Sequence, residues 1–211
     1  MTVAAADLVA LVDPKQTAVL VVDIQEVFVR IPTLYPPVEE VLPRLHRFIH
    51  EARSAGGLVV VIQIAIPPEL YSENWKRQYT DRLRPLPDDW LAPGSEDVAL
   101  HPGFEPQAGD VLITKPRYSA FIGTSLEAIL HSNGIRTVIA AGLTTDVCVG
   151  STARDAFQRD FTTITLADCT AERGREQHEV GLRTLAQNFG MVCTSTEVIA
   201  AWQEQRASIP V

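Results

Sequence analysis

The stretch Thr17-Ala-Val-Leu-Val-Val-Asp23 is a short run of apolar and β-branched residues that ends in a carboxylate. The run does not alternate between apolar and polar residues, which indicates a strand buried on both faces. Such strands belong to parallel sheets that are covered by helices. The stretch therefore predicts the first strand of an α/β fold.

Further segments have the same strand-like character, and helical patterns lie between them. The other strand-like runs cover 57–64, 110–115, 136–142, 162–168 and 190–195. A stripe of apolar residues predicts a helix at 38–55, and more helices are expected at 125–132, 148–159, 174–189 and 197–205. This alternation predicts a doubly wound, six-stranded and mostly parallel sheet with helices on both faces. We expect residues 1–211 to form one domain.

One segment, at about 67–95, departs from this alternation. It is rich in proline and carries aromatic residues, among them Tyr71, Trp75 and Trp90. An excursion of this length in place of a simple turn is often a functional lid. A lid over the carboxyl edge of the sheet and a contact between subunits both fit this composition.

The charge of the chain restricts its partners. The formal net charge is −8, from 18 basic and 26 acidic residues. This balance argues against nucleic acid or an anionic membrane as the main partner, because both require a basic patch. No apolar stretch approaches the roughly 20 residues needed to span a bilayer, and residues 1–12 lack the basic start of a signal peptide. We therefore expect a cytoplasmic protein.

The cysteines indicate free thiols. The chain contains three, Cys148, Cys169 and Cys193. An odd number without paired spacing argues against a disulfide framework. At least one thiol is therefore free, and Cys169 and Cys193 are expected to be ordinary core residues.

Three chemically distinct side chains follow three of the predicted strands. Asp23 ends the first strand, Lys115 ends the third, and Cys148 opens the helix after the fourth. Ligands of open α/β sheets bind at the carboxyl ends of the strands. A thiol at a helix N-terminus beside an ammonium ionises more easily, and a carboxylate can accept its proton and later deliver it to a leaving amine. The trio is therefore a candidate site for acyl transfer.

Each member of the trio also has an ordinary structural role when it is taken alone. A strand-end aspartate such as Asp23 often caps a helix, and a strand-end lysine such as Lys115 is often solvated. A cysteine in the first turn of a helix, like Cys148, is often a small core residue. Spacing alone leaves the three residues as a candidate site.

The same residues lie in blocks that resemble the isochorismatase-like cysteine hydrolase superfamily. The blocks are 18–25 followed by Phe28, 114–121 with Gly123 and Thr124, and 142–149 continuing through Thr152, Arg154, Asp155 and Ala156. Asp168, Cys169 and His178 continue the pattern, so that the resemblance spans roughly residues 15–200. The blocks occur in the family's order, and each falls at the expected strand end.

The resemblance implies a catalytic triad of Asp23, Lys115 and Cys148 on a six-stranded parallel sheet. It also implies a non-proline cis peptide between Leu143 and Thr144, which directs the Thr144 N–H toward an oxyanion beside the Cys148 N–H. Relatives that bind a metal carry histidines after the second strand, whereas this chain reads Gln63-Ile-Ala-Ile-Pro-Pro-Glu-Leu-Tyr71 there. We therefore expect neither a metal nor another cofactor.

Within the superfamily, the blocks around Lys115 and Cys148 resemble most the hydrolases of carbamoyl and ureido compounds: the ureidoacrylate, biuret and N-carbamoylsarcosine enzymes. The resemblance implies cleavage of a C–N bond in a small amide, with release of ammonia. The residues expected to contact substrate are Gln25, Phe28, Arg117, Tyr118, Phe121, Thr145 and Asn188. Asn188 stands where biuret-type enzymes carry a glutamine, which argues against biuret itself as the substrate.

Other readings stay open at this point. The same triad fits another small amide, such as a maleamate-like or nicotinamide-like compound. Arg117 fits a structural ion pair as well as a bond to a substrate carboxylate. A binding module without activity and a redox role for Cys148 are further alternatives, although an intact trio argues against the first and the lack of a resolving cysteine against the second. The resemblance also implies a homo-oligomer, a dimer or a tetramer.

Overall fold

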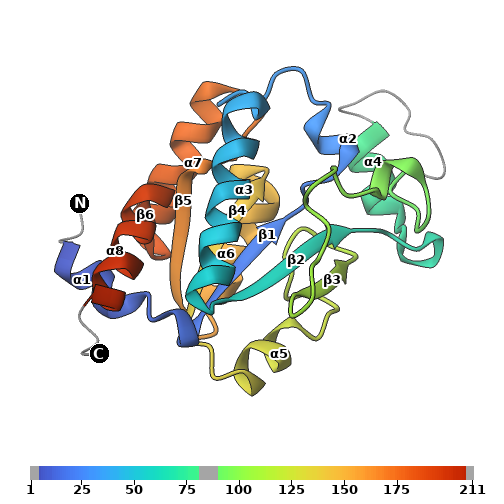
Figure 1. The fold of residues 1–211 in the computed structure, drawn as a ribbon. Helices are drawn as coiled ribbons and strands as arrows, with labels where there is room; N and C mark the ends of the chain where they lie inside the picture. Colours follow the sequence, from blue (N-terminus) through green and yellow to red (C-terminus); the bar gives the residue numbers. More distant parts are fainter. Residues whose placement is uncertain (1–4, 81–89, 208–211) are drawn as a thin grey trace.

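In the computed structural model of the protein, which describes residues 5–80 and 90–207, the centre is a sheet of six parallel strands (Figure 1). The strands are β1 (Thr17–Val22), β2 (Leu58–Ile64), β3 (Val111–Lys115), β4 (Thr137–Leu143), β5 (Thr162–Ala171) and β6 (Met191–Cys193). Their order across the sheet is β3-β2-β1-β4-β5-β6. The chain changes direction across the sheet between β1 and β4, so their carboxyl ends form the switch point at which α/β proteins bind ligands.

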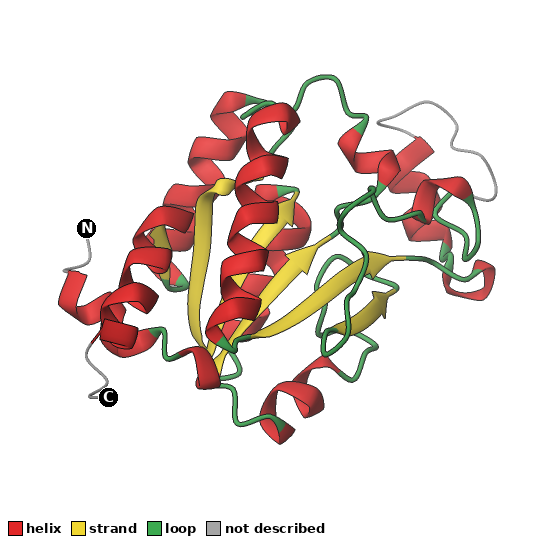
Figure 2. Ribbon diagram, in the orientation of Figure 1, coloured by secondary structure: helices red, strands yellow, loops and turns green. Residues whose placement is uncertain are grey.

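Helices cover both faces of the sheet (Figure 2). The described helices are α1 (Ala5–Leu11), α2 (Glu26–Val29), α3 (Val38–Ala55), α4 (Glu73–Thr80), α5 (Leu126–Ser132), α6 (Gly150–Phe157), α7 (Arg175–Asn188) and α8 (Ser195–Ala207). Residues of α1, α3 and α8 pack on one face, and residues of α5, α6 and α7 pack on the other. None of these described helices is both long and apolar enough to cross a bilayer. The predicted doubly wound α/β fold is confirmed.

The unbroken apolar runs in the sequence are explained by this two-sided cover. All six residues of β1 are buried. Val19 and Val21 join the core on the α3 side, whereas Ala18, Leu20 and Val22 join the core on the α6 side. Successive side chains of a strand point to opposite faces, so a strand buried on both faces needs an apolar residue at every position.

The ends of two strands differ from the prediction. β5 continues past the expected end at Asp168 and pairs as far as Ala171 with Leu143 of β4. β6 is shorter than expected and covers only Met191–Cys193. The extension of β5 brings the residues after it to the end of β4, beside the turn that carries Cys148.

Gly142, near the end of β4, allows this strand to lie close to the backbone of Val22 in β1. Its φ is +122°, and a Cβ built there would lie 2.1 Å from the carbonyl oxygen of Val22. We expect Gly142→Ala to cost about 2–3 kcal/mol more than Gly134→Ala, because Gly134 also has a positive φ but has open space around it. Urea denaturation of both variants measures the difference, and equal losses would contradict the close approach.

Candidate active site

Asp23 and Lys115 meet in the interior although their strands are not neighbours. Asp23 follows β1, Lys115 ends β3, and β2 runs between them. Adjacent strands lie about 4.8 Å apart, so the long lysine side chain must cross one strand to reach the carboxylate. Lys115 Nζ donates to Asp23 Oδ2 at 2.7 Å, and both side chains are fully buried.

The two oxygens of Asp23 have different surroundings. Oδ2 accepts the bond from Lys115, whereas Oδ1 is buried and accepts no hydrogen bond from the described residues. Burial raises the pKa of the Asp23 carboxyl and outweighs the lowering by the Lys115 ammonium and the Cys148 thiol. Asp23 is therefore a stronger base than an ordinary aspartate, with Oδ1 available to accept a proton.

Lys115 stays charged in this buried position. Burial lowers its pKa. The Asp23 carboxylate and Cys148 together raise the pKa by more than burial lowers it, so the pKa lies above its usual value. Its Nζ also donates to the carbonyl oxygen of Arg117 at 3.1 Å. The ammonium is thus held by two acceptors and supplies a fixed positive charge beside the thiol.

The thiol of Cys148 interacts with both partners, but its ionisation differs from the prediction. The residue is only 5% exposed. Burial raises the pKa of the thiol above its usual value; Lys115 opposes this effect and Asp23 adds to it. The sequence-based expectation of an easily ionised thiol is therefore wrong for the resting protein, because desolvation outweighs the effect of the Lys115 ammonium. The neutral thiol needs a base, and Asp23 lies beside it.

The turn that carries Cys148 is π-helical and begins before the residue. It covers Thr145–Val149 (η4), with the N–H of Val149 bonded to the carbonyl of Thr144 at 3.1 Å, and α6 follows directly. Cys148 therefore lies within the turn and does not open a helix as the sequence suggested. Wide turns of this kind are frequent at functional sites. The peptide bond between Leu143 and Thr144, immediately before the turn, is cis.

Glu172 and His178 support this turn and were not among the predicted site residues. The Glu172 carboxylate accepts the N–H of Asp146 at 3.0 Å, and His178 Nδ1 lies 2.8 Å from the Thr145 hydroxyl. Both residues are buried. His178 shares the buried face of α7 with Gly181 and Leu185, and this helical spacing is the signal that sequence reasoning could have used.

The buried His178 predicts a pH-dependent stability. Burial lowers its pKa below the usual 6.5, against the opposing effect of Glu172 and Glu179. The unfolded chain therefore binds more protons near pH 6 than the folded one, so stability is complete above about pH 6.5 and is lost as the pH falls. We expect urea denaturation to show that His178→Gln loses less stability than the wild type as the pH falls below about 6.5. His50→Gln, at an exposed histidine, is the control and is expected to lose as much as the wild type. Equal pH slopes in all three proteins would contradict this account.

Two of the expected substrate contacts are occupied by the protein itself. The Gln25 side chain donates to the carbonyls of Ile64 and Val98 and accepts the N–H of Ile64. The Arg117 guanidinium donates to the carbonyls of Pro116 and Leu70. Both side chains thus hold backbone segments around the site, and we expect them to support it and not to bind substrate. Thr145 is a third expected contact, and its hydroxyl is bonded to His178.

Two other expected contacts interact with residues outside the triad. Phe121 packs into the core against Phe161, with ring centroids 6.1 Å apart, just before β5 begins. Asn188 is exposed at the far end of α7, where its amide donates to the carbonyl of Thr184. The 14 residues of α7, from Arg175 to Asn188, advance about 20 Å along the helix, away from the edge that carries Cys148. Neither interaction supports a contact with substrate, and the roles of Phe121 and Asn188 stay predictions.

The segment at 67–95 is described in part, because residues 81–89 lie outside the described residues. The Tyr71 hydroxyl donates to the carbonyl of Trp90, and the Trp75 ring lies 5.0 Å from that of Tyr118. The Arg117 guanidinium stacks over the same Trp75 ring at 5.2 Å. The described part thus lies against the loop that follows Lys115. Tyr118 packs against the core that contains Cys148, and Phe28 lies buried in α2 shortly after Asp23; their contacts with substrate stay predictions.

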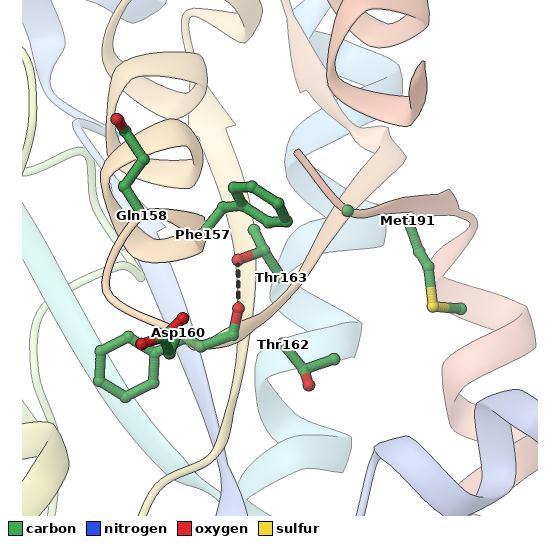
Figure 3. Close-up of a pocket in the computed structure, with 8 residues that line it drawn as sticks. Phe157, Gln158, Asp160, Thr162, Thr163 and Met191 are labelled. Atoms are coloured by element: carbon green, nitrogen blue, oxygen red, sulfur yellow. Dashed lines mark hydrogen bonds between the residues drawn. The ribbon is translucent and has the colours of Figure 1, made fainter. Parts of the chain in front are cut away.

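A cavity of about 510 Å³ opens elsewhere, at the start of β5 and β6 (Figure 3). Its lining residues are Phe157, Gln158, Asp160, Phe161, Thr162, Thr163, Gly190 and Met191. The amino ends of the strands form this edge, whereas Cys148 follows the carboxyl end of β4. The cavity is therefore separate from the Asp23–Lys115–Cys148 site.

Comparison with known proteins agrees with this geometry. The model of the Isochorismatase domain matches residues 17–197. A ureidoacrylate amidohydrolase RutB from Methylorubrum extorquens is 37% identical over 178 residues, which cover 79% of this chain and 72% of the relative. A cysteine hydrolase from Pseudomonas syringae superposes with a TM-score of 0.80 at 26% identity, over 92% of this chain and 95% of that chain. The N-carbamoylsarcosine amidase of Thermoplasma acidophilum superposes with a TM-score of 0.70 at 27% identity, over 85% and 96% of the two chains. The chain belongs to the isochorismatase family of hydrolases.

Proposed function

We propose that the protein is a metal-independent cysteine amidohydrolase that cleaves a C–N bond of a small carbamoyl or ureido compound and releases ammonia. The observation that carries the proposal is the buried bond of 2.7 Å between Lys115 Nζ and Asp23 Oδ2 beside the Cys148 thiol. A buried ion pair contributes little net stability, so its presence beside a thiol favours a chemical role. The names of the ureidoacrylate amidohydrolase and the N-carbamoylsarcosine amidase support the substrate class.

The first half of the reaction forms a thio-acyl enzyme. Asp23 takes the proton of the Cys148 thiol as the sulfur attacks the carbonyl carbon of the amide. The N–H groups of Thr144 and Cys148 stabilise the oxyanion. The positive charge of Lys115 stabilises the negative charge that develops on the sulfur during the attack. The C–N bond then breaks, and Asp23 returns the proton to the nitrogen, which leaves as ammonia.

The second half of the reaction restores the enzyme. Asp23 takes a proton from a water molecule, and the hydroxide attacks the thio-acyl carbon. The C–S bond breaks, the acid product leaves, and the proton returns to the Cys148 sulfur. For a carbamoyl group, the product is a carbamate. No step requires a metal, because the fixed charges of Lys115 and the two N–H groups supply the electrostatic stabilisation.

The burial of the site favours a small substrate. Cys148 is only 5% exposed, and Asp23 and Lys115 are fully buried. A polymer or a peptide would not reach a sulfur enclosed to this extent, whereas a compact planar amide would. A carbamoyl group is planar and has few atoms, so it meets this requirement.

A panel of small amides tests the proposal by ammonia release from the protein after dialysis against a chelator. The panel contains ureidoacrylate, N-carbamoylsarcosine and biuret, with a maleamate and nicotinamide as the other amide classes. We expect the largest kcat/KM for a carbamoyl or ureido compound, and none for the Cys148→Ala control. A maximum on nicotinamide or maleamate would overturn the substrate class. Absence of ammonia from every amide, with folded protein, would overturn the proposed reaction.

A further inference from the structure

Thr152 on α6 connects two parts of the candidate site. Its Oγ1 hydroxyl donates to the carbonyl oxygen of Cys148 at 2.8 Å. Thr152 Oγ1 also accepts a hydrogen bond from the backbone N–H of Ala120 at 3.1 Å. The residue is fully buried, so water cannot replace either bond.

Ala120 belongs to the loop that follows Lys115. The carbonyl of Arg117 in this loop accepts the second bond of the Lys115 ammonium at 3.1 Å. The carbonyl of Ala120 accepts a bond from the Thr124 hydroxyl, so the peptide groups on both sides of Ala120 are held. The Thr152 hydroxyl therefore joins a fixed loop on the lysine side to the turn that carries the sulfur.

The sheet itself does not make this connection. Lys115 ends β3 and Cys148 follows β4, and β2 and β1 lie between these strands. Their loops are thus not held together by strand pairing, and their relative position depends on contacts above the edge of the sheet. A threonine hydroxyl that bonds to the carbonyl four residues earlier also bends the helix locally, and here it bonds to the last part of the π-helical turn.

We infer that Thr152 is a positioning residue that holds the sulfur of Cys148 against the Asp23–Lys115 pair. The inference rests on the proposed function for its effect on turnover, but not for its effect on the reactivity of the thiol. A displacement of about 1 Å of a reacting group can lower a rate about 100-fold. Loss of the hydroxyl therefore lowers kcat while KM changes little, since Thr152 does not touch the substrate.

The test compares Thr152→Val, which keeps the shape and removes both bonds, with Thr152→Ser, which keeps the hydroxyl. Thr137→Val is the matched control, because the Thr137 hydroxyl is buried and bonded to the Leu11 carbonyl at 2.6 Å, but lies at the start of β4. The first readout is the rate of alkylation of Cys148 by iodoacetamide over a range of pH, followed by peptide mass spectrometry. The second is kcat and KM on the most active amide of the panel.

For Thr152→Val we expect alkylation of Cys148 at least about tenfold slower with a shifted pH profile, and kcat about 10–100-fold lower. Thr152→Ser and Thr137→Val are expected within about twofold of the wild type. If Thr152→Val does not fold, Thr152→Ala replaces it in the same comparison. Wild-type alkylation and kcat in the variant without the hydroxyl, or an equal loss in Thr152→Ser, would overturn the inference. A wild type that alkylates as expected but hydrolyses no amide would overturn the proposed function instead.

Discussion

Cys148→Ala is expected to lower kcat/KM for the best amide by on the order of 10⁴-fold or more. The reason is that the covalent route ends without the sulfur, and among the described residues no hydroxyl is hydrogen-bonded to Asp23 or Lys115. Cys148→Ser is expected to be nearly as inactive, because a buried hydroxyl is far harder to deprotonate than a thiol. Ammonia release measures the activity, and thermal melting shows that the variants fold.

Cys193→Ala is the control for this substitution. Burial raises the pKa of Cys193 to about 12, and the residue lies on β6, away from Asp23 and Lys115. We expect its kcat/KM to stay within about twofold of the wild type. A Cys148→Ala variant that kept more than about a tenth of the activity would contradict the role of the sulfur.

Lys115→Met is expected to cost about 3–5 kcal/mol of folding free energy, because it leaves the buried Asp23 carboxylate without its partner. The pKa of Asp23, already raised by burial, then rises further. The folded form therefore holds a proton that the unfolded chain, with an ordinary pKa of about 3.9, has lost. The stability of the variant is thus highest at low pH and falls as the pH rises toward the folded pKa.

Two further variants complete this experiment. Asp23→Asn combined with Lys115→Met removes both charges, and asparagine tolerates the positive φ of +52° at position 23. We expect the double variant to regain part of the lost stability but no activity. Arg44→Met breaks the exposed Arg44–Glu40 pair and is expected to cost less than about 1 kcal/mol. Urea denaturation at several pH values would contradict the account if Lys115→Met cost no more than Arg44→Met.

The sheet and the meeting of Asp23 with Lys115 could be predicted because both depend on strand ends. A run such as 17–22 is apolar at every position only when helices cover both faces, and parallel strands bring their carboxyl ends to one edge. The side chain at each end is then fixed by the sequence. Lys115 needed only enough length to cross one strand.

Features that depend on distant segments could not be predicted in the same way. The raised pKa of Cys148 follows from burial by several elements, and no local sequence pattern records this burial. Gln25 and Arg117 have polar side chains that suit a ligand, but backbone carbonyls of other segments occupy them. The resemblance predicts Asn188 as a substrate contact, but a resemblance of single positions does not record the direction of α7, whose last residue is Asn188.

The most direct test of the central claim is peptide-mapping mass spectrometry of the protein quenched in acid during turnover of its best amide. The account predicts that the acyl group of the substrate is found on the peptide that contains Cys148, and on neither of the peptides with Cys169 and Cys193. An acyl group attached to any other residue during turnover would contradict it.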